Sequence, residues 1–169
     1  MDAISTLSIS EDLINRDLRE RILVSVSSYV SDYYVSFSGG RIFLDLNLHV
    51  KALGDLSAKY MLEVLDFRFD KESHFIKLSY QEDIKSRGGP MQGIMLKAAG
   101  FTGGTFLQKA LSITNPPGVW ADQKSCSLNL EQLFNLKKGI LSDLEAHYLD
   151  SRNGLLQFSF FISTLPFSQ

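Results

Sequence analysis

The residue types that most often carry catalysis or bind metals are few in this 169-residue chain, and they are widely spaced. The three histidines, His49, His74 and His147, form no His-x-x-x-His pair, and Cys126 is the only cysteine. Structural zinc sites use four cysteine or histidine ligands at short spacings. The sequence therefore predicts no metal site, no cofactor and no intramolecular disulfide, and we expect a protein that is not an enzyme.

Ordinary structural roles explain these side chains better than chemistry does. Cys126 alternates with serines in a predicted short strand, and free cysteine is among the most buried residue types, so we expect a small core side chain rather than a nucleophile. His49 and His147 fall on the polar sides of their predicted strands, where a solvated histidine is the usual case. The carboxylates of Asp70, Glu72, Asp143 and Glu145 belong to strand faces and turns, and nothing in the sequence places two of them in a cleft.

The glycine-rich stretch GIMLKAAGFTGGTFLQKALSI, residues 93–113, is the other candidate for chemistry. A phosphate-binding Walker loop needs Gly-x-x-x-x-Gly-Lys-Ser/Thr between a strand and a helix, and this stretch has neither that spacing nor a preceding strand. We interpret residues 91–113 as one long helix that Gly100, Gly103 and Gly104 thin or bend. Its apolar stripe either packs as core against a sheet or lines part of a groove: Met91, Met95, Ala98, Phe106, Ala110 and Ile113.

The elements that would position this helix are long strands. Apolar residues alternate with mostly polar ones from Ile42 to Val50, which predicts a strand with one buried face. Further strands are predicted over 56–69 and 75–80, and the apolar positions change parity after Val64, which indicates a β-bulge. A closing hairpin turns at residues 153–154, an Asn-Gly pair.

The predicted architecture is a single α+β domain spanning residues 1–169. A long, curved antiparallel sheet wraps around the long glycine-interrupted helix. An amphipathic helix precedes the sheet, because Ser8 and Glu11 have the spacing of a capping box and Ile14, Leu18 and Ile22 repeat every four residues.

The composition and charge of the chain argue against some classes of partner. The net charge of −2 and the absence of a basic cluster argue against nucleic acid. No stretch reaches the roughly 18 consecutive apolar residues of a membrane-spanning helix, so we expect no integral membrane segment. The first residues do not read as an export signal. The expected location is the periplasm if such a signal has been removed, and the cytoplasm otherwise.

The order of these segments resembles that of a known family. SISEDLINRDLRERI is followed by GGRIFLDLNLHVKALGDLSAKYMLEVLDFRFD, the apolar helix, SLNLEQL and NGLLQFSF. Over about residues 8–163 this order is similar to that of small bacterial tubular lipid-binding (TULIP-like) proteins, which include periplasmic lipoproteins of unknown role. The resemblance implies a long helix lying in a curved sheet, with lipid or another apolar molecule between them.

The functional hypothesis is therefore non-enzymatic binding of a lipid or other apolar ligand in a groove between helix and sheet. The residues that we expect to line this groove are Leu44, Leu46, Leu62, Val64, Met95, Phe101 and Phe106. The alternative is a structural or assembly protein with a closed core, which would pair through a strand edge or as a homodimer. A third reading, an enzyme of the helix-grip kind, fits less well because such domains end with their long helix and this chain ends in a strand.

Overall fold

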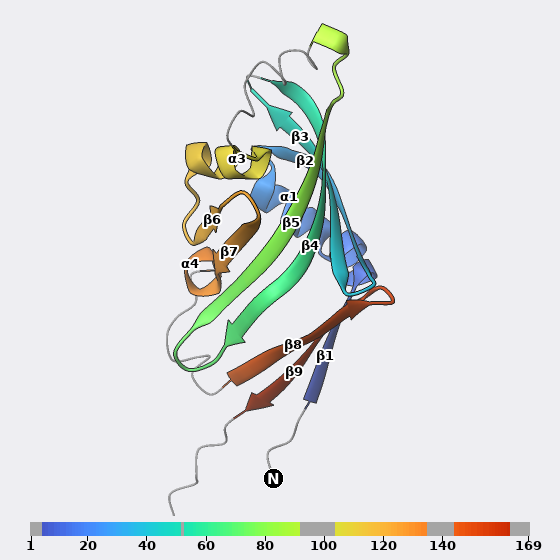
Figure 1. Ribbon diagram of the computed structural model, residues 1–169. Coiled ribbons are helices and arrows are strands. Elements are labelled where there is room, and N and C mark those ends of the chain that lie inside the picture. The colour runs from blue at the N-terminus through green and yellow to red at the C-terminus, as the bar shows by residue number, and fades with distance from the viewer. Residues whose placement is uncertain (1–4, 52, 92–103, 135–143, 163–169) are drawn as a thin grey trace, which may run out of the picture.

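The computed structural model describes residues 5–51, 53–91, 104–134 and 144–162. Its described strands form one antiparallel nine-stranded sheet, with short helical elements beside it (Figure 1). In chain order the elements are β1 (Ser5–Ser10), the π-helical turn η1 (Leu13–Asp17), α1 (Arg19–Val26), β2 (Val30–Ser38), β3 (Arg41–Val50), β4 (Gly54–Phe69), β5 (His74–Ser86), α3 (Phe106–Thr114), β6 (Val119–Ala121), β7 (Ser125–Asn129), α4 (Leu130–Phe134), β8 (Leu144–Arg152) and β9 (Leu155–Ile162).

The long strand β4 divides the sheet into two sections. It pairs with β5 along most of its length, whereas β3 pairs with it only as far as Leu62. Near its end β4 meets β8 at a single residue pair, Phe69 with Ala146. We call β6-β7-β5-β4-β3-β2 the six-stranded section and β8-β9-β1 the three-stranded section. In Figure 1 the three-stranded section lies below the other and runs at an angle to it.

The turns of the β2–β3 and β8–β9 hairpins contain residues that tolerate positive φ, and these turns bring the two sections together. The β2–β3 turn has Gly39 at φ 60° and Gly40 at φ 79°, and the β8–β9 turn has Asn153 at φ 54° and Gly154 at φ 74°. Two consecutive positive φ values match the twist of tight hairpins. The Gly154 N–H donates to the carbonyl of Phe37 over 3.0 Å. The strand predicted from Ile42 to Val50 is confirmed as β3, and so is the predicted turn at 153–154.

The predicted bulge in β4 is also confirmed. The register against β5 shifts between Val64 and Asp66, so Leu65 is the extra residue and its side chain is exposed. Because side chains alternate along a strand, one extra residue returns Phe67 and Phe69 to the face that carries Val64. The apolar row of β4 thus continues past the bulge.

The N-terminal capping-box prediction is wrong. Ser8 lies in β1, which pairs with β9, and it is Ser10 that caps the first helical turn by accepting from the Leu13 N–H over 3.1 Å. The Glu11 carboxylate instead accepts from the Phe37 N–H of β2 over 2.5 Å. The local capping-box pattern is therefore not realised, because Ser8 pairs with β9 and Glu11 binds the backbone of β2.

The predicted long helix is wrong as well, and with it the α+β class built around that helix. Thr105 is extended, at φ −86° and ψ 164°, and its hydroxyl accepts from the Gln108 N–H, so α3 begins at Phe106 and has nine residues. Gly104 therefore lies ahead of the helix, where a Cβ would stand 2.8 Å from Oε1 of Gln108. Gly100 and Gly103 fall outside the described residues. What the structure describes is mostly antiparallel sheet with short helices.

The core lies on one face of the six-stranded section, which we call the inner face. Direct cross-strand pairs place Leu48 beside Leu56 and Leu62 beside Tyr80 on this face. Phe106 of α3 packs onto it, and Cys126 of β7 completes the cluster. The predicted burial of Cys126 is confirmed. The opposite face, called the outer face, carries the alternate and mostly polar residues.

Candidate ligand-binding site

Helix α3 is fixed to the inner face by Glu82 of β5. The Glu82 carboxylate accepts from the Phe106 N–H over 2.5 Å and from the Leu107 N–H over 3.0 Å. These are N–H groups of the first helical turn, which have no partner inside the helix, and a carboxylate there also faces the positive end of the helix dipole. Burial, followed by the negative charge of Glu82, raises the pKa of the neighbouring Tyr60.

A second polar contact fixes the same helix from its N-cap. The Tyr80 hydroxyl donates to the carbonyl of Asp122 over 2.6 Å and also contacts the Thr105 hydroxyl. Because the single phenolic proton goes to Asp122, the Thr105 hydroxyl must donate to the Tyr80 oxygen. Burial raises the pKa of Tyr80 and that of the Cys126 thiol, the latter to about 11. Tyr60, Tyr80 and Cys126, whose pKa values are all raised, therefore stay neutral near pH 7.

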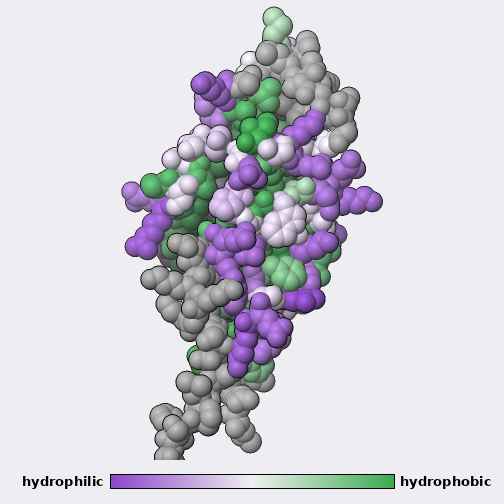
Figure 2. Space-filling view, turned by 90° about the vertical axis from the view of Figure 1, so that its left-hand side faces the viewer, coloured by the Kyte–Doolittle hydropathy of each residue, from purple (hydrophilic) through white to green (hydrophobic). Residues whose placement is uncertain are grey.

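Beside α3 lies an apolar hollow, which we call the α3 hollow. It has a cavity volume of about 370 Å³ and opens between α3 and the end of β3. Its lining residues are Tyr29, Leu48, Val50, Leu53, Phe106, Lys109, Ala110, Ile113 and Thr114. Figure 2 looks onto this side of the molecule, and hydrophobic residues gather in its upper part, at the height of α3 in Figure 1. The Ile113 side chain is 84% exposed, so an apolar group stands open at the mouth of the hollow.

A second apolar hollow, the β9 hollow, lies at the other end of β4. It has a cavity volume of about 380 Å³ between β4 and the three-stranded section, and its lining is wholly apolar: Leu7, Phe67, Phe69, Leu130, Leu144, Ala146, Phe158 and Phe160. The rings of Phe67 and Phe158 lie 5.2 Å apart. Since Phe67 and Phe69 continue the inner row of β4, both hollows lie on one apolar face of the sheet.

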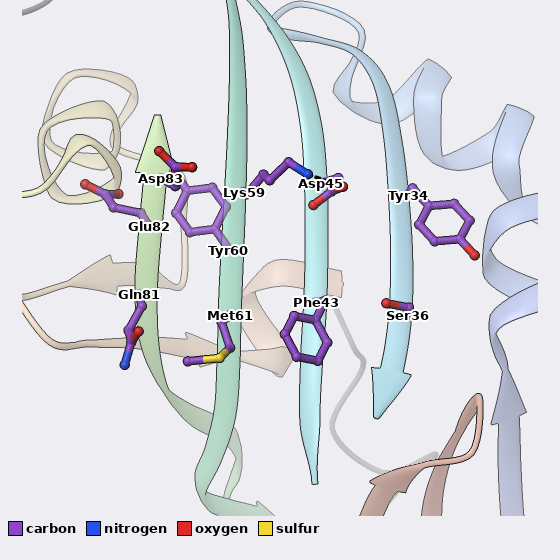
Figure 3. Close-up of a pocket in the computed structure, with 10 residues that line it drawn as sticks. All are labelled: Tyr34, Ser36, Phe43, Asp45, Lys59, Tyr60, Met61, Gln81, Glu82 and Asp83. Carbon is purple, nitrogen blue, oxygen red and sulfur yellow. Dashed lines mark ion pairs between the residues drawn. The ribbon is translucent and has the colours of Figure 1, made fainter. Parts of the chain in front are cut away.

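The outer face has a hollow of different character, drawn in Figure 3. Its volume is about 490 Å³, and side chains from β2, β3, β4 and β5 line it. Lys59 reaches across to Asp45, with Nζ 3.4 Å from Oδ2, while Phe43 and Met61 form a small apolar strip beneath them. Both members of this ion pair are at least half exposed. We interpret this hollow as a solvated sheet surface, because its ion pair is exposed and exposed ion pairs contribute little.

The residues predicted to line a groove are partly brought together. Leu44, Leu46, Leu62 and Val64 all lie on the inner face and pack against the core cluster around Phe106. Phe106 lines the α3 hollow, whereas these four residues line none of the hollows described above. Met95 and Phe101 lie outside the described residues.

The residues predicted to line the groove did not include those at the far ends of the apolar pattern. Val50 ends the alternating run of β3, and Leu53 follows it in the turn before β4. Ala110 and Ile113 belong to the predicted apolar stripe of α3, so signals for the α3 hollow were present. The residues of the β9 hollow come from β1, β4, α4, β8 and β9, which are distant in sequence. No local pattern indicates that these elements meet.

The positions of the three histidines fit structural roles. His49 and His147 are more than half exposed, as predicted. His74 is buried, with Nδ1 2.6 Å from Oε1 of Glu131 on α4 and its ring edge-on to Phe69 at 4.4 Å. His74 therefore links α4 to the start of β5.

The described parts of the chain contain no cluster of three or more potential metal-ligating side chains. Among the helices described here, none has the length and apolarity needed to cross a membrane. No protein-family model matches this chain, and no curated protein or solved structure is significantly similar to it.

Proposed function

We propose that this protein binds a lipid or another apolar ligand, without catalysis, in the α3 hollow. The observation that carries the proposal is an open cavity of about 370 Å³ whose walls are nearly all aliphatic or aromatic. Ligand pockets typically have volumes of 300–1,000 Å³ and combine apolar walls with a few polar groups. Tyr29, Lys109 and Thr114 are the polar members of this lining, which suits an amphipathic ligand with one polar end.

Apolar burial supplies the expected affinity. Each methylene group removed from water contributes about 0.8 kcal/mol, so an alkyl chain that fills the hollow gains several kcal/mol. The hollow needs little rearrangement to accept the chain, because Glu82 and Tyr80 already fix the start of α3. A preformed wall reduces the entropic cost of binding.

A relationship to the tubular lipid-binding proteins is part of this proposal. An antiparallel sheet with one continuous apolar face and hollows along it supports the relationship. The long central helix does not enter into it, since α3 is short.

A dye-displacement experiment with two matched alanine variants tests the proposal. Purified protein is titrated with N-phenyl-1-naphthylamine, an apolar fluorescent dye, and palmitate is then added as competitor. Ala110→Phe fills the α3 hollow, and Ala146→Phe adds the same bulk to the β9 hollow. We expect Ala110→Phe to weaken dye binding at least tenfold, about 1.4 kcal/mol, and Ala146→Phe to leave it unchanged.

Two results would overturn the proposal: no palmitate-sensitive binding to the wild-type protein, or loss of binding with Ala146→Phe alone. If Ala110→Phe does not fold, as judged by circular dichroism, Ile113→Lys replaces it. That side chain is already solvent-exposed, so the variant tests the mouth of the hollow without disturbing the core.

A further inference from the structure

The outer edges of the sheet are not equally protected against pairing with another chain. Exposed edge strands carry unpaired N–H and C=O groups, and proteins usually shorten, charge or cover them. The edge at β6 is short, with three residues, and it closely follows Pro116 and Pro117. This edge offers little backbone to a partner strand.

The edge at β2 is covered by side chains from the N-terminal segment. The Asn15 side chain accepts from the Val35 N–H over 2.8 Å and donates to the Val35 carbonyl over 2.6 Å. Arg19 donates to the carbonyl of Tyr33 over 3.1 Å, and Glu11 accepts from the Phe37 N–H. Alternate residues of β2 therefore have their outward backbone groups occupied.

The edge at β1 has neither protection. All six residues of β1 pair with β9 on one side, and no hydrogen bond from a described residue reaches the backbone on the other side. Its sequence, STLSIS, contains no charged residue and no proline. The backbone N–H and C=O groups on this side can pair with another β-strand, and β1 has no charged side chain or proline that would oppose the pairing.

The side chains of β1 suit a second copy of the same strand. Leu7 and Ile9 lie on the apolar face, opposite Phe158 and Leu156 of β9, while Thr6 and Ser8 lie on the polar face. Two β1 strands can pair antiparallel about a twofold axis with apolar residues sharing one side and hydroxyls the other. No like charges meet in this arrangement. Leu7 also lines the β9 hollow, so the pairing would extend that apolar surface across both copies.

We propose that the protein forms a twofold homodimer in which β1 pairs with β1 of a second copy and joins the two sheets. This goes beyond the proposed ligand binding, because the edge lies in the three-stranded section and does not involve the α3 hollow. Pairing with an extended peptide of another protein is the competing use of the same edge.

Sedimentation equilibrium of the full chain over a wide concentration range tests the dimer. We expect a monomer–dimer equilibrium in the wild-type protein. Leu7→Glu should weaken it at least tenfold, because it places two carboxylates close together across the twofold axis. Leu149→Glu is the matched control: Leu149 is 51% exposed and Leu7 is 50% exposed, but Leu149 lies in the bulge of β8, away from the edge.

Amide hydrogen exchange then tests strand pairing itself. The outward N–H groups of β1 should exchange more slowly at concentrations where the dimer forms than where it does not, and those of β7 should not change. Ser8→Lys adds a charge to the edge on the polar face, leaves the apolar face intact, and should also weaken the dimer. A wild-type protein that stays monomeric, or a dimer that neither variant weakens, would overturn the proposal and leave a foreign peptide as the partner to examine.

Discussion

The inner face of the six-stranded section and the apolar face of the three-stranded section follow the same rule of alternation, yet they are covered differently. Over the first, α3 is held by Glu82, Tyr80 and Thr105, so that Phe106 is buried. Over the second, the phenylalanines of β9 remain partly exposed, and the described residues place only α4 nearby. In this molecule, buried polar partners fix where the helix begins.

The largest expected difference between the two faces is in how much one phenylalanine side chain contributes to the free energy of unfolding. Phe106→Ala should lower the free energy of unfolding by about 3–4 kcal/mol, because it empties a packed site. Phe160→Ala should cost about half as much, since its ring is already partly hydrated. Urea unfolding at a concentration too low for dimers measures both. Equal losses would show that the β9 hollow is as well packed as the core.

A smaller difference is expected between two tyrosine hydroxyls. Tyr80→Phe leaves the Asp122 carbonyl without its donor and the Thr105 hydroxyl without its acceptor, at a cost of about 2 kcal/mol. Tyr148→Phe, in the three-stranded section, removes one contact of 2.8 Å to the Ser151 hydroxyl and should cost about 1 kcal/mol. Thermal unfolding of both variants checks the order, and a larger loss for Tyr148→Phe would contradict it.

The smallest effect concerns pH and Cys126. Burial raises the pKa of its thiol from 9.0 to about 11, so between these values the unfolded chain ionises while the folded chain does not. Stability from this group is therefore complete below pH 9 and decreases as the pH rises toward 11. By pH 10 the wild-type protein should lose about 1 kcal/mol relative to Cys126→Ala. The raised pKa values of Tyr60 and Tyr80 act in the same direction but are present in both proteins, so they cancel in the difference.

That measurement compares the free energies of unfolding of the two proteins at pH 7.5 and pH 10. An identical pH dependence would mean that water reaches the thiol in the folded state. The buried side of β7 would then resemble the partly exposed three-stranded section.

Local patterns in the sequence predicted much of the sheet. Alternation from Ile42 to Val50 specified β3, the parity change after Val64 specified the bulge, and Asn153 with Gly154 specified the last hairpin. Each of these signals lies within a few residues. The strand prediction for β5 stopped short of its polar second half, where Glu82 points inward to cap a helix.

Contacts between distant segments could not be predicted in the same way. The β1 strand pairs with β9 almost a full chain length away, and its own sequence also fitted the approach to a helix. Glu11 matched a capping box but serves β2 instead. The start of α3 depends on the contact of Thr105 with Tyr80 and on the bond from the Phe106 N–H to Glu82, which no helical periodicity reveals.

The extra residue at Leu65 has a consequence for how this chain tolerates insertions and deletions. Before Leu65 the even-numbered residues of β4 face inward, and after it the odd-numbered residues do. Deleting Leu65 would leave Val64 and Asp66 as direct neighbours opposite Leu78 and Lys77 of β5, in an uninterrupted ladder. Phe67 and Phe69 would then stay on the inner face, and Asp66 and Arg68 on the outer face. The exposed leucine at the bulge is therefore the residue of β4 whose loss the inward and outward alternation of the strand tolerates best.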